Sequence, residues 1–351
     1  MSTCKDNSIP ALKLSIVVCC YCGETTIQAC LLSLLNQRVD SSLFEIILVD
    51  DGSQDDTQYV IREFLKNLKE KEASQIKYYR KTNEGLSVAR NYGIDKSNGE
   101  FISFVDEDAI VDEFFVRNII SEFNSKATAD CIGGRVSILN PEDEFASFIH
   151  DIIFCRYMED EDAVIGTNMS FRKTFLSDSG GFDPAFTYRG DETALFAKNN
   201  GSIGIHKAPN INVWHKQPTS AKAWLKTRYE NGFFGSWIDI RYRLTKHDLF
   251  VKALKRIVNT ALAPLGLILC FLQFVELGIL ALITFLLLIF CRACLNKEFK
   301  YGLLRIKNSY SFFRFHLVFR LFYLSILGLL NSDIGYLKGI LKYRITTREH
   351  G

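Results

Sequence analysis

Short apolar runs alternate with amphipathic stretches over residues 14–125. The apolar runs have the length of strands and fall at residues 14–20, 44–49, 76–80 and 101–105. In the stretches between them, apolar residues recur every three or four positions, which is the spacing of a helix with one buried face. These helices are expected at residues 25–37, 57–69 and 86–96. The alternation predicts an α/β fold with a mostly parallel, Rossmann-like sheet flanked by helices.

The pattern is less regular after residue 127. It predicts a strand over 131–139, a helix through 145–157 and a turn-rich stretch at 179–184, followed by a short helix that carries Leu195. A further helix is expected over 220–237. In this middle portion we expect the sheet to end and one side of a binding pocket to be built.

A largely apolar stretch of 31 residues, 261–291, contains Glu276 as its only acidic or basic member. Such a run exceeds what a soluble core helix needs and predicts a membrane-associated helical region. Basic residues flank it on both sides, so the positive-inside rule places both flanks on the cytoplasmic face and requires an even number of crossings. We therefore expect a hairpin over about residues 258–294, with interfacial helices over about residues 311–341 beside anionic lipid.

Charge divides the chain at about the same place. Residues 1–240 carry 25 Lys and Arg against 35 Asp and Glu, whereas residues 241–351 carry 17 against 5. The formal net charge of +2 therefore conceals an acidic part and a basic part. The first ten residues are polar and lack the apolar segment of a signal peptide, so we expect no cleaved signal. The chain is thus predicted to comprise an N-terminal tail (1–11), an α/β domain (12–240) and a basic helical membrane region (241–351).

Two clusters of carboxylates follow predicted strands. Asp50 and Asp51 end the second strand, and Asp106 and Asp108 follow the fourth. Because open α/β sheets bind ligands at the carboxyl ends of their strands, we expect both clusters at one site. Residues i and i+2 of an extended segment point the same way, so Asp106 and Asp108 can face one ligand while Glu107 faces aside. Such carboxylates suit Mg²⁺ or Mn²⁺ completed by substrate phosphates, a nucleotide, or both.

Plainer interpretations of some residues stand beside these. Asp55 and Asp56 can simply cap the helix that follows them. Arg90 is either a phosphate partner or a surface helix residue, and a single histidine after a strand-like run, such as His215, is more often structural than a ligand. A metal-dependent nucleotidyltransferase also uses paired acids on an α/β sheet. It would normally carry a glycine-rich phosphate loop after the first strand, and Cys22–Thr25 does not supply one.

Several ordered motifs together resemble the family 2 glycosyltransferases of the GT-A type, over roughly residues 12–235. The motifs are an opening strand with the first helix, a nucleotide-binding turn, a segment beside the sugar nucleotide, a metal-binding Asp-x-Asp and an acceptor-side motif. They correspond in this chain to residues 15–21 with 29–37, Val49–Ser53, Asn83–Asn91, Asp106–Asp108, and Gly181–Asp183 with Gly190–Leu195.

The resemblance implies a role for each matching residue. Asp51 would contact the nucleotide base. Asp106 and Asp108 would hold a divalent metal, Mn²⁺ or Mg²⁺, against the diphosphate, and His215 would complete the metal site. The other residues beside the nucleotide sugar, besides Asp51 and Asp106, would be Cys19, Tyr21, Asn83 and Arg90.

In the family, an acid of the later motif is the general base that takes the proton of the acceptor hydroxyl. The order in this chain is Asp191-Glu192, where the commoner order is Glu-Asp. Counting back from Leu195 favours Glu192 as the base, whereas the side-chain type favours Asp191. The sequence leaves both acids as candidates.

The resemblance thus implies an enzyme, a hexosyltransferase-like, metal-dependent and inverting glycosyltransferase on the cytoplasmic face of a membrane. It would move a sugar from a nucleotide-sugar donor, with a UDP-sugar favoured, to a lipid-linked or saccharide acceptor in the synthesis of a cell-surface polysaccharide or glycan. Nucleic acid is not expected as a partner. The alternatives are the nucleotidyltransferase above and a non-catalytic, membrane-anchored carbohydrate-binding protein, although every acid that catalysis needs is present.

Overall fold

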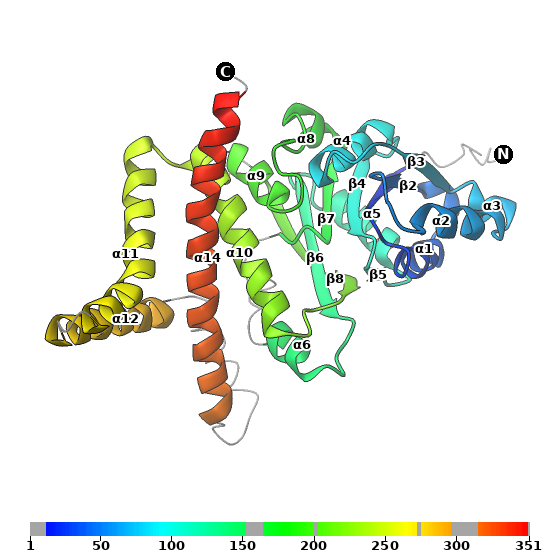
Figure 1. The fold of residues 1–351 in the computed structure, drawn as a ribbon. Helices are drawn as coiled ribbons and strands as arrows, with labels where there is room; N and C mark the ends of the chain where they lie inside the picture. The colour runs from blue at the N-terminus through cyan, green and yellow to red at the C-terminus, as the bar shows by residue number, and fades with distance from the viewer. Residues whose placement is uncertain (1–11, 152–163, 200–202, 272–274, 296–314, 350–351) are drawn as a thin grey trace, which may run out of the picture. The chain divides into compact units, whose positions relative to one another are not determined.

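The structure is a computed structural model that describes residues 12–151, 164–199, 203–271, 275–295 and 315–349 (Figure 1). These residues form two compact units. The first unit contains the described residues of 12–139 and 164–216, and the second contains those of 140–151 and 217–349. Residues 217–240, which the sequence pattern assigned to the α/β domain, therefore pack with the helical unit.

The first unit is built on a mixed sheet, for which the described strands have the order β3-β2-β1-β4-β7-β6-β8-β5. β1, β2, β3 and β4 pair in parallel, as the strand–helix alternation predicts. β7 joins β4 antiparallel, and β5 joins β8 antiparallel, so the sheet is mixed rather than mostly parallel. The strands are β1 (Leu14–Cys20), β2 (Phe44–Asp50), β3 (Ile76–Arg80), β4 (Phe101–Asp106), β5 (Ile110–Val111), β6 (Cys131–Ile138), β7 (Asn168–Arg172) and β8 (Ile205–His215).

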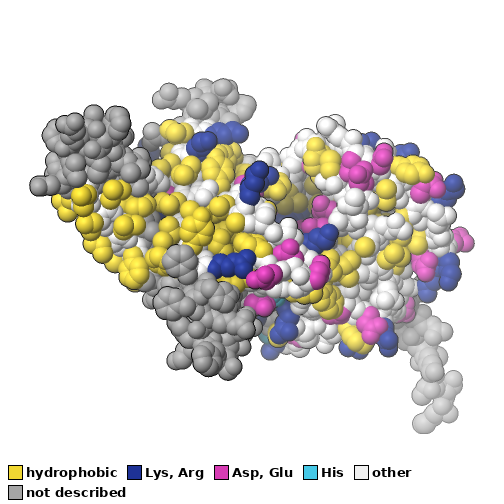
Figure 2. All heavy atoms as spheres, turned by 60° about the horizontal axis from the view of Figure 1, so that its bottom comes forward, with side chains coloured by type: hydrophobic (Ala, Val, Ile, Leu, Met, Phe, Trp, Pro, Cys, Tyr) yellow, Lys and Arg dark blue, Asp and Glu magenta, His cyan; other side chains and the backbone are white. Residues whose placement is uncertain are grey.

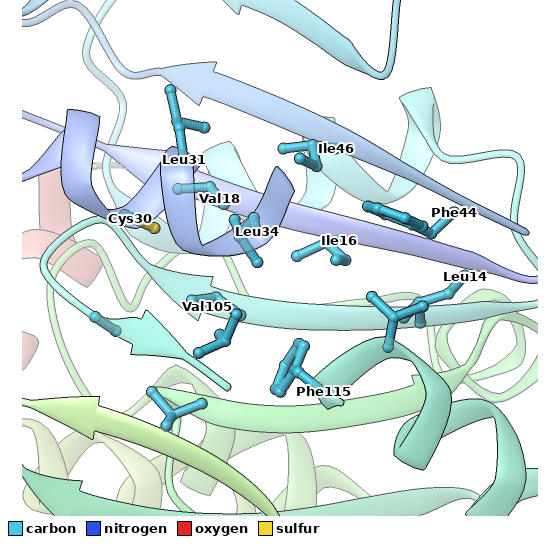
Figure 3. Close-up of a cluster of buried hydrophobic side chains, with 14 of the residues drawn as sticks. Leu14, Ile16, Val18, Cys30, Leu31, Leu34, Phe44, Ile46, Val105 and Phe115 are labelled. Atoms are coloured by element: carbon cyan, nitrogen blue, oxygen red, sulfur yellow. The ribbon is translucent and has the colours of Figure 1, made fainter. Parts of the chain in front are cut away.

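Helices cover both faces of this sheet. Successive residues of β1 point to opposite faces, and both sets are buried, as expected for an interior strand. On one face, Leu31 and Leu34 of α1 lie over Ile16 and Val18 (Figure 3). On the other face, Val17 belongs to a second cluster with β7 and α4 residues. The helices of this unit are α1 (Ile27–Leu35), α2 (Thr57–Lys66), α3 (Glu70–Ala73), α4 (Leu86–Lys96), α5 (Phe115–Ser125), α8 (Lys173–Asp178) and α9 (Asp191–Lys198), with a 3₁₀ turn η1 (Ser41–Leu43).

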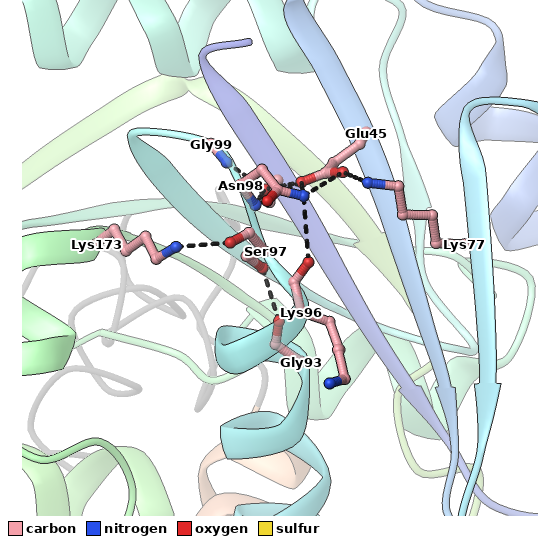
Figure 4. Close-up of polar contacts among 9 residues, drawn as sticks. Glu45, Lys77, Gly93, Lys96, Ser97, Asn98, Gly99 and Lys173 are labelled. Atoms are coloured by element: carbon pink, nitrogen blue, oxygen red, sulfur yellow. Dashed lines mark hydrogen bonds and ion pairs between the residues drawn. The ribbon is translucent and has the colours of Figure 1, made fainter.

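A buried carboxylate holds the amino ends of β1 and β2 to the turn between α4 and β4. Glu45 accepts hydrogen bonds from Ser15 Oγ (2.7 Å), the backbone N–H of Asn98 (2.7 Å) and Lys77 Nζ (2.6 Å) (Figure 4). Burial alone would raise the pKa of Glu45, but these hydrogen bonds outweigh it and lower the pKa. The network fixes the turn at the C-terminal end of α4 against the sheet. The preceding part of α4 carries residues of the site.

The second unit is helical. Its largest helix, α14, packs against α10 so closely that a Cβ added at Gly232 would come within 1.9 Å of the Ser332 carbonyl oxygen. Trp237 Nε1 also donates a hydrogen bond to the Gly339 carbonyl (2.9 Å). The helices are α6 (Glu144–Ile149), α10 (Ala221–Ile238), a π-helical turn η3 (Asp239–Arg243), α11 (Lys246–Phe271), α12 (Val275–Leu295) and α14 (Phe315–Glu349).

The expected membrane hairpin is not confirmed. In the described part of the chain, no helix has both the length and the apolar character needed to cross a membrane. A helix expected over 311–341 is present as α14, in which Leu321, Leu324 and Tyr336 are buried and Tyr323, Ile334 and Leu341 are exposed. The helix expected over 145–157 is seen as α6, and its residues beyond 151 lie outside the described ranges.

Candidate functional site

The two carboxylate clusters lie at one edge of the sheet, on either side of β1. The parallel register pairs Cys20 of β1 with Asp50 of β2, and Cys19 with Asp106 of β4. Because all three strands run in the same direction, their carboxyl ends meet at this edge. The chain therefore brings the two clusters together by strand pairing alone, as their positions after apolar runs predict.

Asp50 and Asp51 have different partners although they are neighbours. Asp50 is fully buried and accepts hydrogen bonds from the Ser53 N–H (2.8 Å) and the Tyr78 hydroxyl (3.0 Å), so it shapes the turn. Asp51 accepts from Lys81 Nζ (2.8 Å) and from the backbone N–H of Gly85 (2.8 Å). It thereby ties the end of β2 to the loop that leads into α4.

Asp106, Asp108 and His215 form a cluster with the composition of a divalent-metal site. One ligand atom from each residue lies within 4.8 Å of the others, and all three side chains are half-buried. The pairing of β5 with β8 sets Ile110 opposite Trp214. It thereby brings Asp108, which lies just before β5, close to His215, the residue after Trp214. The antiparallel pairing of β4 with β7 similarly brings Thr167, whose hydroxyl donates to Asp106 Oδ2 (2.6 Å).

The electrostatics of this cluster fit a cation. His215 Nε2 lies 3.2 Å from Asp108 Oδ1. Burial disfavours the charged imidazole, but the hydrogen bond and negative charge of Asp108 prevail and raise the pKa of His215 to about 9. A divalent metal would replace this proton. Two carboxylates and one imidazole are ligands that Mn²⁺ and Mg²⁺ sites use or accept, so the residues present fit such an ion.

Glu107 lies apart from the cluster. Its side chain packs against Gly23, where an added Cβ would be 3.0 Å from Glu107 Cγ. Burial, together with the negative charges of Asp106 and Asp108, raises the pKa of Glu107 to about 8. As expected for the middle residue of an extended i, i+2 pair, it does not join the three clustered ligands.

Arg90 links the metal-type cluster to the later acidic motif. Its side chain is buried, and one guanidinium nitrogen pairs with Asp191 Oδ2. The other lies 3.3 Å from Asp106 Oδ1 and donates to the Gly166 carbonyl (3.3 Å). Burial opposes the charged form, but the two carboxylates prevail and raise the pKa of Arg90, so it stays a cation. The alternative that Arg90 is a surface helix residue is wrong.

Asp191 and Glu192 occupy the first turn of α9, which follows Gly190 in the left-handed conformation (φ 83°). Asp191 is buried and held by Arg90. The Oε1 of Glu192 accepts a hydrogen bond from Thr193 Oγ1 (3.3 Å). Burial and the adjacent charge of Asp191 raise the pKa of Glu192 to about 7. Glu192 Oε2 also lies 3.6 Å from the position a Cβ would take at Gly166, beside Arg90.

The loop before α9 is fastened to α4, which completes one continuous site. Asn91 exchanges two hydrogen bonds with the backbone of Phe182, at 2.7 and 2.8 Å. The Ser87 hydroxyl donates to the Phe186 carbonyl (2.6 Å). Gly85 has a φ of 93°, and an added Cβ there would meet Thr187 at 2.6 Å. The Asn83–Asn91 segment and the segment from Gly181 to Glu192 therefore support each other.

Residues 15–180, which contain β1, the Asp51 turn and the Asp106–Asp108 pair, match the family model described as glycosyl transferase family 2. These residues form a domain of glycosyltransferase family 2. Its match to the model begins in β1 and ends just before the later acidic motif.

Two curated relatives are similar to part of this chain. EpsH of Bacillus subtilis, named as a glycosyltransferase, is 40% identical over 95 residues, which cover 27% of this chain and 26% of EpsH. The minor teichoic acid biosynthesis protein GgaB of the same bacterium is 31% identical over 110 residues, covering 31% of this chain and 12% of GgaB. The chain thus spans about a quarter or less of the length of these relatives.

A solved structure shares the fold more broadly. The mannosyltransferase PcManGT from Pyrobaculum calidifontis, determined with GDP-Man and Mn²⁺, matches with a TM-score of 0.58 and 14% identity. The match covers 93% of this chain and 87% of PcManGT. At this identity the likeness concerns the fold, and it agrees with the predicted GT-A-type α/β architecture.

The remaining predicted contact residues differ in their exposure to solvent. Tyr21 is exposed directly after β1, and Asn83 is exposed in the loop that Asp51 holds. Cys19 is almost fully buried, and its side chain packs in the second core cluster. Its backbone, rather than its thiol, is therefore the part available to a bound nucleotide sugar. Thr167, Gly166 and Lys81 were not predicted; the first two could be found only from the β4–β7 pairing.

Proposed function

We propose that this chain transfers a sugar from a nucleotide-sugar donor to a saccharide or lipid-linked acceptor, with inversion at the anomeric carbon. The observation that carries the proposal is the position of the buried Arg90. It pairs with Asp106, one of the three clustered metal ligands, and with Asp191 of the later acidic motif. One guanidinium thus fixes the distance between the groups that would serve the donor and the group that would serve the acceptor. The relative GgaB, named for minor teichoic acid biosynthesis, supports a cell-surface polysaccharide as the product.

The donor side of the site supplies three ligands and one turn. Asp106, Asp108 and His215 would hold Mn²⁺ or Mg²⁺, which neutralises the diphosphate as it leaves. The exposed Tyr21 and Asn83 flank the turn at Asp51 and are available to a base and ribose. Both oxygens of Asp51 already accept hydrogen bonds from the Lys81–Gly85 loop. One of these oxygens would in addition contact the nucleotide. A UDP-sugar is the first donor to test.

The acceptor side supplies the general base, and we assign this role to Glu192. Asp191 is already paired with Arg90, so an acceptor hydroxyl would compete with the guanidinium for it. Glu192 has a pKa of about 7, close to the value at which a base is both deprotonated and basic near neutral pH. The acceptor O–H proton passes to Glu192, the acceptor oxygen bonds to the anomeric carbon, and the bond from that carbon to the diphosphate oxygen breaks.

A donor screen followed by turnover tests this function. UDP-, GDP- and TDP-sugars are added with Mn²⁺ to the full chain, and we expect one nucleotide class to raise Tm selectively, because a ligand bound only to the folded state stabilises it. Turnover with an acceptor should release the nucleoside diphosphate. Release of sugar 1-phosphate, with transfer of the nucleoside monophosphate, would instead indicate a nucleotidyltransferase. Selective saccharide binding without turnover would indicate a carbohydrate-binding protein.

The metal ligands give the decisive variant. Asp108→Ala should lose Mn²⁺-dependent donor hydrolysis and transfer by about 100-fold or more, because one of three protein ligands is removed. Asp95→Asn, on the exposed surface of α4, is the matched acid-to-neutral control and should keep full activity. Unchanged metal-dependent activity in Asp108→Ala would refute the proposed site.

A further inference from the structure

Large apolar side chains are exposed along one face of α12. Six of them recur at intervals of one, three or four residues, which places them on a single stripe. Each is between 47% and 61% exposed. They are Ile279, Leu280, Ile283, Leu286, Leu287 and Phe290. Soluble proteins rarely leave a contiguous apolar stripe of this length in water, so the stripe indicates a surface for binding.

The polar residue within this stripe does not interrupt it. The Thr284 hydroxyl donates a hydrogen bond to the Leu280 carbonyl of its own helix (2.8 Å), so it needs no further partner from water. The other side of α12 is already anchored, because Arg292 pairs with the fully buried Asp333 of α14. At the end of the exposed stripe itself, the ring of Phe290 lies 5.7 Å from that of Phe322 of α14. The orientation of α12 in its unit is therefore fixed, and its exposed stripe is an outer surface.

α11 presents a second stripe of the same kind. Phe250, Leu254, Ile257 and Val258 follow the i, i+4, i+7, i+8 spacing of one helix face, and each is 42% to 65% exposed. Figure 2 shows hydrophobic side chains gathered in a broad area at the left of the view, where Figure 1 places α11 and α12. Exposed Lys246 lies one turn before Phe250, and exposed Lys255 is adjacent to Leu254.

Charge selects the partner for this apolar area. Residues 241–351 carry 17 basic against 5 acidic residues. A second copy of the chain would bring the same basic residues to the same contact, because a two-fold interface pairs a patch with itself. An anionic lipid surface instead offers negative headgroups to the lysines and an acyl region to the apolar stripes, which is the arrangement of an interfacial helix.

We propose that the exposed faces of α11 and α12 bind the surface of an anionic lipid bilayer. The apolar side chains enter the boundary between headgroups and acyl chains, while Lys246 and Lys255 meet the headgroups. The helices lie on the bilayer and need not cross it. The proposal concerns the helical unit alone and does not depend on the proposed sugar transfer.

Vesicle flotation of the full chain, without donor or metal, tests the proposal. We expect binding to phosphatidylcholine vesicles that contain phosphatidylglycerol, weaker binding to phosphatidylcholine alone, and loss of the difference at high salt. Leu286→Ser with Leu287→Ser should lower the partition coefficient by about tenfold or more, since two apolar side chains that would enter the bilayer are removed. Lys246→Gln with Lys255→Gln should lower it by roughly 20-fold on anionic vesicles only.

Matched controls keep the result interpretable. Leu32→Ser changes an equally exposed leucine on α1 of the other unit, and Lys66→Gln changes an exposed lysine there. Both should bind vesicles as the unchanged chain does, and all variants should keep the far-UV circular dichroism and Tm of that chain. Absence of vesicle binding, equal binding by the α12 variant, or a soluble dimer that this variant converts to monomer would each overturn the proposal. Transfer to a soluble acceptor is measured separately, so failure of one proposal is distinguishable from failure of the other.

Discussion

Asp191 and Glu192 show how two neighbouring acids of similar chemistry can acquire different roles. In the first turn of α9, Asp191 pairs directly with the buried Arg90. The charge of Arg90 also lowers the pKa of Glu192, but burial and the charge of Asp191 outweigh it. A carboxylate paired with a cation is held ionised, whereas a buried carboxylate next to another negative charge is pushed toward protonation. The order of the acids left the choice of base open, and the pairing of Arg90 with Asp191 is the reason that we propose Glu192.

We predict that the pH dependence of transfer follows Glu192. Its pKa is raised to about 7, and the base must be deprotonated, so kcat/KM should rise tenfold per pH unit below 7 and level off above it. Glu192→Gln should lower kcat by about 10² to 10⁴-fold and leave donor binding intact. The measurement is a pH–rate profile with donor affinity determined separately by thermal shift.

Asp191→Asn is the matched variant for this assignment. Removing its charge should lower the pKa of Glu192 and move the break in the profile to lower pH, while Tm falls because Arg90 loses a buried partner. If Asp191→Asn lost most of its transfer activity with an unshifted pH profile, and Glu192→Gln remained active, Asp191 would be the base.

At the residue scale, sequence reasoning found the ligand types and missed their neighbours. The geometry brings Asp106, Asp108 and His215 together, although 107 positions separate the last two in the chain, because β5 pairs with β8. The partners of Arg90 and the bond from Thr167 to Asp106 were not predictable, since they depend on the antiparallel pairing of β7 with β4. Periodicity identifies a strand but does not say which strand lies beside it.

At the element scale, α4 is the part on which the site depends most. It begins at the loop held by Asp51, carries Arg90 and Asn91 in its middle, and ends at the turn held by Glu45. Gly93 lets it approach β1: an added Cβ would lie 2.3 Å from Val17 Cγ1. The glycine is therefore a packing requirement in a helix whose position sets the site.

We predict that Gly93→Ala destabilises the first unit and weakens transfer. Overpacking of this kind costs about 1–3 kcal/mol and would displace the helix that carries Arg90. Gly235→Ala in α10 is the matched control, because nothing lies within 4 Å of its added Cβ. It should raise stability by about 0.5–1 kcal/mol through helix propensity. Urea unfolding measures both, and an unaltered Gly93→Ala variant would contradict this view of α4.

The elements themselves were the most predictable part of the fold. The sequence pattern predicted β1, β2, β3 and β4 within one residue of their observed bounds. For β1, β2 and β4 the reason is that strands buried on both faces are nearly continuous apolar runs, which leave little ambiguity. The later strands were harder to predict, because β5 has only two residues and β8 extends over mixed polar and apolar positions. The mixed character of the sheet arises there.

At the scale of the whole molecule, composition and packing draw different boundaries. The charge balance changes near residue 240, whereas the compact units part at residues 139 and 216. Composition reports what faces water or lipid, and packing reports which side chains cover one another. α10 is the segment on which the two disagree: Trp224 is 4% exposed because Leu321 and Leu324 of α14 cover it.

This disagreement gives a prediction about truncation. A chain that ends at residue 240 would keep α6 and α10 but lose α14, and would expose Phe148, Ile149 and Trp224. Each buried apolar side chain of this size contributes about 1.5–3 kcal/mol, so this chain should aggregate or melt at a lower temperature than the full chain. A chain that ends at residue 216, with residues 140–163 replaced by a short Gly/Ser linker, loses both sides of that contact together. It should stay monomeric and keep a single cooperative transition. Size-exclusion chromatography and thermal melting compare the three chains, and a soluble 240-residue chain with an unchanged Tm would show that the charge boundary, not the packing boundary, separates the folding units.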